Sequence, residues 1–222
     1  MKISNRRFPQ VLAICGIDGS GKTTQLRMLA KYFTDRGVKF KYVWFRWTVL
    51  FSYPFLALCR LLGYTKWRTI EKSGVRYAMR NFYRNKAIAK LWPWLFAIDT
   101  LIRAAFSIYI PLKLGYFILC DRYMPDIVVD LMGDTGDPDL LKRLPGKLLV
   151  TFVPKHSIIF LIDLDEQTAY RRKRDTPSIE NLKEKRKLYL KLVQVFRISV
   201  IYGGKKIEEI HREVVERLNL VT

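Results

Sequence analysis

The sequence is poor in the residues that build most disulfides and transition-metal sites. It has three cysteines, Cys15, Cys59 and Cys120, and two histidines, His156 and His211. The cysteines show no CxxC or paired spacing, and neither histidine lies near one of them, which argues against a metal site of this type. Two of the cysteines end apolar runs. We therefore expect buried thiols in a reducing compartment, the cytoplasm.

Long apolar runs are also missing. The first ten residues, MKISNRRFPQ, lack the apolar core of a signal peptide. The most apolar stretch, residues 47–59, has 13 residues, lies between Arg46 and Arg60 and contains Pro54. Because a bilayer span needs about 20 apolar residues, we predict no transmembrane segment. A buried helix or helical hairpin is the expected structure, with contact to a membrane surface as the alternative.

Acidic residues are half as numerous as basic ones, 20 against 40, which gives a formal net charge of +20. Such a chain attracts anions, whether nucleotides, other phosphorylated small molecules or nucleic acid. A well-solvated basic surface has the same composition, so charge alone does not select among these partners. Half of the residues are apolar, and no repeat or linker interrupts the chain. We therefore predict a single domain, residues 1–222.

The stretch GIDGSGKTT, residues 16–24, matches the phosphate-binding loop G-x-x-x-x-G-K-[ST]. Its glycines let backbone amides point at an anion where a Cβ would obstruct them. Lys22 can reach the β- and γ-phosphates of ATP, and the Thr23 hydroxyl can bind Mg²⁺. An apolar strand-like run precedes the loop and a helical pattern follows it, which is the context the motif requires. The predicted nucleotide-binding residues are Gly16, Ile17, Asp18, Gly19, Ser20, Gly21, Lys22, Thr23 and Thr24.

Strand-like and helical patterns alternate along the chain. This order is typical of an α/β protein, a three-layer α/β/α fold with a five-stranded parallel sheet. We predict residues 47–113 to be mostly helical and residues 132–139, MGDTGDPD, to form a loop. The predicted strands are 11–15, 39–45, 116–120, 156–165 and 197–202, and the predicted later helices are 180–196 and 207–218.

Ligands of a parallel sheet bind beyond the carboxyl ends of its strands. Asp121, Arg122 and Tyr123 end the third predicted strand, and the phosphate-binding loop ends the first. Asp121 is the candidate for a second Mg²⁺ ligand, and Arg122 can hold a phosphate with two hydrogen bonds. An ordinary ion pair at a strand end is the alternative for this Asp–Arg pair.

These motifs resemble those of the thymidylate kinase family of P-loop nucleoside monophosphate kinases. That family joins a P-loop containing a carboxylate to a DR[YF] motif after the third strand. Its helix motif [FY]-A-A-D-R also lies 21 residues before that motif. Here FAID ends in Asp99, and 21 residues separate Asp99 from Asp121. Residues 161–174, LIDLDEQTAYRRKR, are similar to the family's fourth strand and basic lid.

The resemblance implies a P-loop NTPase fold with a helical lid at about residues 168–182 and an acceptor side at about 47–113. It implies Mg²⁺-dependent transfer of the ATP γ-phosphoryl group to a nucleoside monophosphate, first of all dTMP, and it allows a homodimer. Since residue 20 is serine, the loop itself brings no arginine. The family then relies on lid arginines, for which Arg171, Arg172 and Arg174 are available. A nucleic-acid-binding patch is the alternative for this basic run.

The acceptor side departs from the family pattern. The Arg-Glu-Pro-Gly-Gly loop after strand two is absent, and Arg46 alone offers a comparable charge. Thr100 replaces the arginine of the helix motif, with Arg103 one turn later. Asp126, Asp130 and Leu131 stand where the family has Ser and Tyr-Gln. The acceptor contacts implied by the resemblance are therefore Asp18, Arg46, Asp99, Arg103, Arg122 and Tyr123.

Two of these acids allow more than one role. Asp18 either accepts a hydrogen bond from a sugar hydroxyl or stabilises the loop as a turn residue. Asp99 either orients Arg103 or Arg122 or pairs with a surface lysine. The acceptor itself also has alternatives: another phosphorylated small molecule, or no acceptor at all in a P-loop nucleic-acid-binding ATPase.

Overall fold

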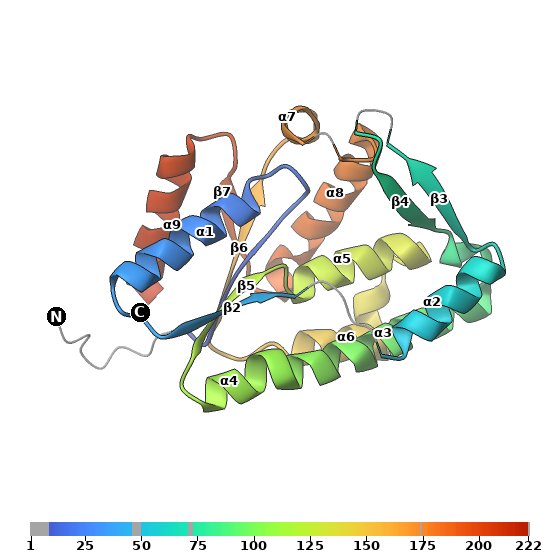
Figure 1. Ribbon diagram of the computed structural model, residues 1–222, viewed down its shortest axis with the longest axis horizontal. Helices are drawn as coiled ribbons and strands as arrows, with labels where there is room; N and C mark the ends of the chain where they lie inside the picture. The colour runs from blue at the N-terminus through green and yellow to red at the C-terminus, as the bar shows by residue number, and fades with distance from the viewer. Residues whose placement is uncertain (1–8, 46–49, 71–72, 174, 222) are drawn as a thin grey trace.

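The computed structural model describes residues 9–45, 50–70, 73–173 and 175–221 (Figure 1). A parallel five-stranded sheet with the order β2-β5-β1-β6-β7 forms its centre, which confirms the predicted fold class. The strands are β1 Val11–Cys15, β2 Phe40–Trp44, β5 Phe117–Asp121, β6 Ser157–Asp163 and β7 Ser199–Tyr202.

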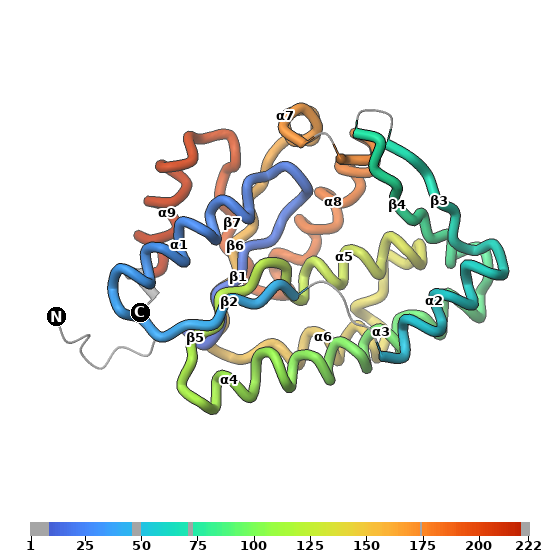
Figure 2. The backbone as a smooth tube through the Cα atoms, viewed as in Figure 1, coloured from blue at the N-terminus to red at the C-terminus, as the bar shows by residue number. Residues whose placement is uncertain are grey.

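Two layers of helices cover the sheet (Figure 2). Helices α1 and α9 pack on one face, where their apolar side chains meet those of Leu12 and Phe160. The other face carries the larger core, built with α2, α3, α5, α6 and α8. Because both faces are covered, all five residues of β1 and of β5 are buried. The helices are α1 Lys22–Asp35, α2 Ser52–Leu61, α3 Lys86–Ala104, α4 Ile110–Lys113, α5 Met124–Thr135, α6 Leu144–Thr151, α7 Glu166–Arg172, α8 Ile179–Val195 and α9 Ile207–Val221.

The segment predicted to be mostly helical contains an antiparallel hairpin instead of helix at residues 65–80. Its strands are β3 Thr65–Thr69 and β4 Arg76–Arg80, and Thr65 pairs with Arg80. The turn contains Gly74, whose φ of 68° is one that glycine adopts readily and whose amide bonds to the Ile70 carbonyl at 2.8 Å. The basic and aromatic residues around it suit either structure, so the turn and the tertiary contacts decided the outcome.

The predicted loop at residues 132–139 is also shorter than expected. Helix α5 continues to Thr135 and ends at Gly136, which takes the left-handed conformation common after a helix (φ 63°). Short turns complete the chain: the 3₁₀ turns η1 Phe82–Arg84 and η3 Leu140–Lys142 and the π-helical turn η2 Ala105–Tyr109.

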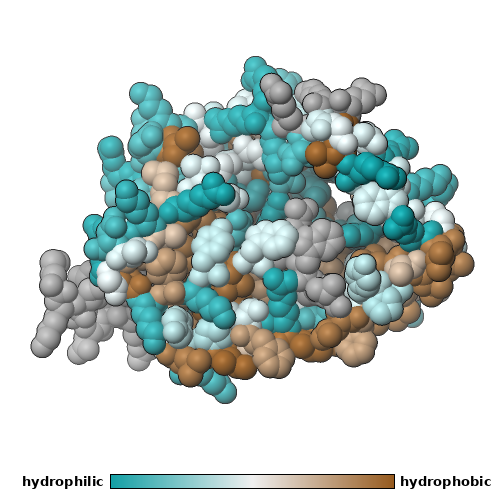
Figure 3. All heavy atoms as spheres, in the orientation of Figure 1, coloured by the Kyte–Doolittle hydropathy of each residue, from teal (hydrophilic) through white to brown (hydrophobic). Residues whose placement is uncertain are grey.

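The three cysteines are buried and free, as predicted. Among the described residues, one helical stretch, Lys86–Lys113, is long and apolar enough to cross a membrane, with a mean hydropathy of 1.6 in its most apolar part. In the fold, 39% of that part is buried, and the core helix of a globular domain meets the same criterion. Its outward side leaves Phe106 and Ile110 exposed. An apolar band runs along the lower edge of Figure 3, where α3 and α4 lie in the same view in Figure 1.

Candidate active site

The phosphate-binding loop follows β1 and depends on its glycines. Gly16 has φ 139°, and a Cβ there would lie 2.7 Å from the carbonyl oxygen of Ile162 on β6. Gly19 has φ 88°, and a Cβ there would collide with the backbone of Ala169 on α7. Only glycine fits both positions. The close approach at Gly19 also shows that α7, the start of the predicted lid segment, packs directly on the loop.

Lys22 begins α1 and its side chain folds back into the loop. Its ammonium donates hydrogen bonds to the carbonyl oxygens of Gly16, at 2.7 Å, and Ile17, at 2.6 Å. Burial, with the nearby charge of Arg122, lowers the pKa of Lys22 to about 8. The Ser20 hydroxyl is also buried, and no residue in the described part of the chain hydrogen-bonds to it. A buried cation, an unpaired hydroxyl and the N-terminus of α1 together suit a polyphosphate.

The predicted metal ligands are brought together at the end of β5. The Thr23 hydroxyl donates to Asp121 Oδ2 at 3.2 Å, although 97 residues separate them. The two meet because β1 and β5 are adjacent, with Ile14 opposite Asp121. No cluster of three or more His, Cys, Asp or Glu occurs among the described residues. A hydroxyl and one carboxylate are hard oxygen ligands that suit Mg²⁺ when phosphates supply further oxygens.

Tyr42 on β2 is a residue of this site that sequence reasoning missed. Its hydroxyl donates to the same Asp121 oxygen at 2.8 Å. Strand β2 lies beside β5, and Val43 and Trp44 are paired with Cys120 and Asp121. Nothing in the sequence signals this contact, because it depends on which strand borders β5.

Arg122 lies buried between two carboxylates. Its guanidinium contacts Asp18 Oδ1 at 2.5 Å and Asp126 Oδ1 at 3.4 Å. Its backbone takes φ 70°, which is rare for a residue other than glycine and aims the side chain back toward the loop. Tyr189 on α8 donates its hydroxyl to the same Asp126 oxygen at 2.7 Å. Two acceptor residues predicted from the sequence, Asp18 and Arg122, are thus in direct contact.

Several cations surround the Asp18 carboxylate. Burial by itself would raise its pKa, but the charges of Arg122, Lys22 and Lys173 hold the pKa of Asp18 well below its usual range. Asp18 therefore stays ionised, and the structure adds an ion pair with Arg122 to the two roles considered from the sequence.

Asp99 and Arg103 have partners that the sequence did not predict. The Asp99 carboxylate accepts hydrogen bonds from the backbone amides of Phe51, at 3.0 Å, and Ser52, at 2.8 Å. It caps the start of α2, and among the described residues it pairs with neither Arg103, Arg122 nor a lysine, so neither role expected from the sequence is found. Arg103 donates to the carbonyl oxygen of Trp44 at 2.7 Å.

Tyr123 does not reach the site in this conformation. Its side chain is fully buried, with its ring 6.1 Å from that of Phe45. A side chain without exposed atoms cannot touch a ligand, so its predicted contact with the acceptor is not supported.

The lid arginines lie on the outside of α7. Arg171 donates to the Thr168 hydroxyl at 3.2 Å, and Arg172 to the carbonyl oxygen of Gly203 at 3.4 Å. Both are exposed. The predicted site residues Arg46 and Arg174 lie outside the described part of the chain.

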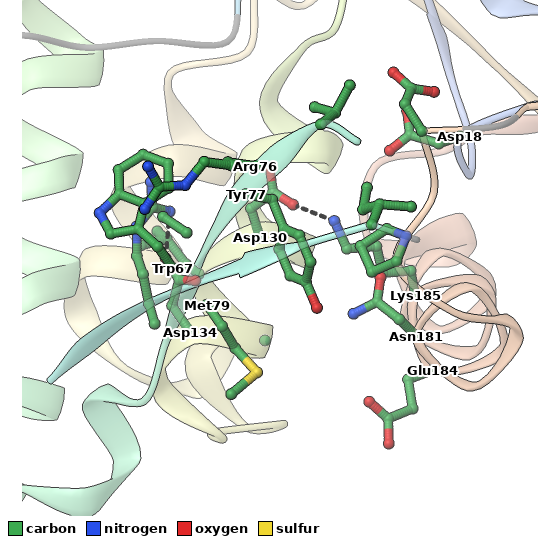
Figure 4. A pocket seen from close by; sticks show the side chains of 18 of the residues that line it. Asp18, Trp67, Arg76, Tyr77, Met79, Asp130, Asp134, Asn181, Glu184 and Lys185 are labelled. Atoms are coloured by element: carbon green, nitrogen blue, oxygen red, sulfur yellow. Dashed lines mark hydrogen bonds and ion pairs between the residues drawn. The ribbon is translucent and has the colours of Figure 1, made fainter. Parts of the chain in front are cut away.

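A cavity of about 650 Å³ opens beside Asp18 (Figure 4). The β3–β4 hairpin forms one wall, α5 another, and α8 with the residues before it a third. The ion pairs that line it include Lys185 with Asp130 at 2.8 Å and Arg80 with Asp134 at 2.9 Å. Asp130 is one of the positions at which this chain departs from the family pattern. The hairpin wall is the part of the site that the sequence did not predict.

Comparison with known proteins identifies relatives over most of the chain. No protein-family model matches it. It is 27% identical over 216 residues to the probable thymidylate kinase of Pyrococcus abyssi, covering 90% of this chain and 91% of the relative. The probable thymidylate kinase of Pyrococcus horikoshii is 28% identical over 208 residues, covering 90% and 91%. The thymidylate kinase of Thermosipho melanesiensis is 30% identical over 165 residues, covering 74% and 70%.

The glycine loop with its buried lysine, the hydroxyl beside a strand-end aspartate and the parallel sheet define a P-loop phosphotransferase of the nucleoside monophosphate kinase class. Within that class, the curated relatives settle the family. The chain belongs to the thymidylate kinase family, as its motifs predicted.

Proposed function

We propose that this protein transfers the γ-phosphoryl group of ATP to a nucleoside monophosphate with the help of Mg²⁺, and that dTMP is its first acceptor. The observation that carries the proposal is the convergence of three groups at one edge of the sheet: the lysine of the loop, the Thr23–Asp121 pair and the Asp18–Arg122 pair. The cavity beside Asp18 supplies space for an acceptor. The names of the relatives support dTMP.

On the donor side, the amides of residues 16–24 and the Lys22 ammonium hold the polyphosphate. Phosphoryl transfer needs charge neutralisation and alignment more than covalent participation. Thr23 and Asp121 hold Mg²⁺, which neutralises charge on the β- and γ-phosphates when bound. Lys22 exchanges its two carbonyl partners for phosphate oxygens, which also return its pKa toward the ordinary value of a lysine.

On the acceptor side, Arg122 holds the phosphate that receives the γ-phosphoryl group. Its contact with Asp18 of the loop supports this role, because a phosphate bound to Arg122 would lie near the γ-phosphate held by the loop. Asp18 then accepts a hydrogen bond from a sugar hydroxyl of the acceptor nucleotide. Asp126 keeps the Arg122 guanidinium in place. The lid arginines, Arg171 and Arg172, must turn inward to stabilise the transferring group.

The experiment that tests this function is a panel of monophosphates assayed for ADP release with ATP and Mg²⁺. We expect the highest kcat/KM with dTMP and little ADP release without an acceptor. Activity only with a phosphorylated sugar or lipid precursor would support the assignment as a kinase but show that its acceptor is not a nucleotide. Activity with no phosphorylated acceptor would remove the kinase assignment.

Nucleic acid is the rival partner that the net charge suggests, and the structure weakens it. Three basic residues of the run from 171 to 191 form ion pairs within the protein: Lys173 with Asp18 and Asp175, Lys185 with Asp130, and Arg186 with Asp163 and Glu166. These side chains therefore stabilise the fold and the cavity wall through their ion pairs, which leaves fewer free cations for nucleic acid. Adding DNA or RNA to the ATPase assay is the control, and stimulated hydrolysis with a steep salt dependence would favour the rival.

We also propose that the protein works in the cytoplasm as a homodimer joined through the apolar outer side of α3 and α4. Five exposed apolar residues follow one another on that side at helical spacing: Leu91, Ile98, Phe106, Ile110 and Leu114. Figure 3 shows an apolar band along its lower edge, where α3 and α4 lie in the same view in Figure 1. Sedimentation of the wild type and of Phe106→Glu tests this, with a dimer expected only for the wild type. Co-sedimentation with lipid vesicles would point to a membrane surface instead.

A further inference from the structure

Helix α2 is apolar on all its sides, although the fold covers only one of them. Its sequence, SYPFLALCRL, contains a single charged side chain, Arg60. The inner side carries Ser52 and Cys59, which are buried. A helix that is apolar all round is normally enclosed by a protein core or a membrane. The composition of α2 therefore calls for a partner on its outer side.

The outer side of α2 exposes three leucines at helical spacing. Leu58, Leu61 and Leu62 lie three and four residues apart, which places them on one face at the end of the helix. They are 51%, 85% and 59% exposed. Figure 3 shows apolar side chains at the right-hand end of the molecule, where α2 lies in the same view in Figure 1. None of the three lines the cavity beside Asp18, so they form a separate surface.

Hydrogen bonds bring basic residues to this end of α2. The hydroxyl of Tyr64, just after the helix, accepts from the Asn85 side chain at 3.0 Å. The Tyr64 carbonyl oxygen also accepts from the Asn81 amide at 2.9 Å. These bonds fix the start of α3 beside the end of α2, with Arg84 and Lys86 on either side of Asn85 in the chain.

The positive charge at this end is not balanced by acids. Residues 50–98 contain nine basic residues and one acidic residue, Glu71. Four exposed cations lie on α2, η1 and the start of α3, and none of them forms an ion pair with a residue that the structure describes. Together with the three leucines they make up the α2 tip: Leu58, Arg60, Leu61, Leu62, Arg84, Lys86 and Lys90.

The chemistry of the α2 tip selects among possible partners. A second copy of the chain would bring the same four cations against these, and like charges repel. A nucleic acid would pair with the cations but would leave the leucines uncovered, since its surface is a row of charged phosphates. An anionic lipid bilayer satisfies both parts, because it has negative headgroups over an apolar interior.

We propose that the α2 tip docks on an anionic lipid bilayer, with its leucines at the boundary of headgroups and acyl chains and its cations on the headgroups. Anionic lipids give the cytoplasmic leaflet its negative surface potential, so the site would hold the protein at that face of a membrane. The proposal does not rest on the proposed kinase function. Its leucines lie on α2, whereas the proposed dimer uses α3 and α4, so separate variants distinguish the two surfaces.

The test is co-sedimentation of the full chain with vesicles of phosphatidylcholine alone and of phosphatidylcholine with phosphatidylserine. We expect binding only with phosphatidylserine, and this binding should weaken as salt rises, because salt screens the cations. Leu61→Glu should weaken it by about 10-fold or more, since a charge replaces apolar area at the membrane boundary. Leu190→Glu is the matched control, a leucine of α8 that is 45% exposed, and it should bind as the wild type does.

Lys86→Glu supplies a second arm, which tests the charge. Loss of one cation near an anionic surface should weaken binding by about fivefold, and reversal of its sign by more. Lys187→Glu, at an exposed position of α8, changes the net charge equally and should have a smaller effect. Because all four side chains are exposed, circular dichroism should show the wild-type fold in each variant.

Equal binding by Leu61→Glu and the wild type, binding to phosphatidylcholine alone, or no binding to either vesicle would overturn the proposal. Full binding by Leu61→Glu together with loss of binding by Phe106→Glu would place the membrane on the outer side of α3 and α4 and would also overturn it. Binding of the wild type to DNA but not to vesicles would make the tip a nucleic-acid surface instead.

Discussion

The donor and acceptor sides of the cleft are built in different ways. Residues 11–35 alone make the strand, loop and helix that surround Lys22. The cavity that we propose for the acceptor takes residues from the loop, the hairpin, α3, α5 and α8. A site made of one continuous segment keeps its sequence motif when the protein diverges. A site assembled from distant segments can change its residues one element at a time.

The two sides also differ in how their charges are balanced. Lys22 contacts only carbonyl oxygens, and burial lowers its pKa to about 8. On the acceptor side, Arg122 and Lys185 each face carboxylates, Asp18 and Asp130. Lys22 therefore has no carboxylate partner and its charge is available to a polyphosphate. The acceptor side is close to neutral, so an incoming phosphate must compete with the protein's own acids.

The largest effect that this contrast predicts comes from Lys22→Ala. Removing the single buried cation of the donor side should lower kcat by on the order of 1,000-fold, because no neighbouring cation replaces it. The measurement is ADP release with ATP and dTMP, with circular dichroism to show that the fold remains. Lys31→Ala, an exposed lysine of the same helix, is the control. A folded Lys22→Ala with wild-type turnover would contradict the mechanism.

Arg122→Lys should produce the next largest effect, on the acceptor alone. A lysine cannot reproduce the two aligned hydrogen bonds of a guanidinium. We expect kcat/KM for the acceptor to fall about 30- to 150-fold, equivalent to about 2–3 kcal/mol, with little change in the KM for ATP. Arg103→Lys should cost less than about fivefold, because loss of one hydrogen bond is worth about 1 kcal/mol. If Arg103→Lys had the larger effect on kcat/KM, Arg103 and not Arg122 would be the residue that holds the acceptor phosphate.

Tyr42→Phe tests the proposed metal site on the donor side. Its hydroxyl orients Asp121, and loss of such an outer contact weakens metal binding by about 10-fold or more. We expect a matching rise in the Mg²⁺ concentration for half-maximal activity, and weaker Mn²⁺ binding by electron paramagnetic resonance. Tyr32→Phe, on the outer layer of α1, should leave both values unchanged. If Tyr42→Phe bound the metal as tightly as the wild type, the Tyr42 hydroxyl would not be needed to orient Asp121.

The lowered pKa of Lys22 predicts a pH dependence of ATP binding. Below about pH 8 the free lysine is protonated, and above it the proton must be taken up when the phosphates bind. Affinity should therefore fall about 10-fold per pH unit above that value. Calorimetry in buffers of different ionisation enthalpy measures the uptake, about half a proton near pH 8. Lys22→Ala should show none, and uptake that persists in it would assign the proton to another group.

Asp99→Ala should have the smallest effect on catalysis and a clear effect on stability. Asp99 caps α2, so its loss should lower the free energy of unfolding by about 1–2 kcal/mol, as measured by urea denaturation. Asp99→Asn keeps an acceptor oxygen and should recover most of that loss. Unchanged stability together with a large fall in acceptor kcat/KM would return Asp99 to the acceptor site.

Much of the fold and half of the site were predictable from the order of amino acids. The strand, glycine loop and helix are contiguous, and only glycine fits Gly16 and Gly19, so local sequence carries their structure. The Thr23–Asp121 pair was predictable one step further on, because parallel strands end at the same edge of a sheet. The central strands β1, β5 and β6 were predictable because strands that are buried on both faces form continuous apolar runs.

Tertiary structure decided the rest. Residues 65–80 became a hairpin because their turn and the Arg80–Asp134 anchor outweigh a basic and aromatic pattern that suits helix as well. Asp99 became a helix cap because packing brought the start of α2 to it. Tyr42 reached Asp121 because β2 borders β5. Each of these contacts joins segments far apart in the chain, and the energy that selects them comes from packing and ion pairs that no local pattern contains.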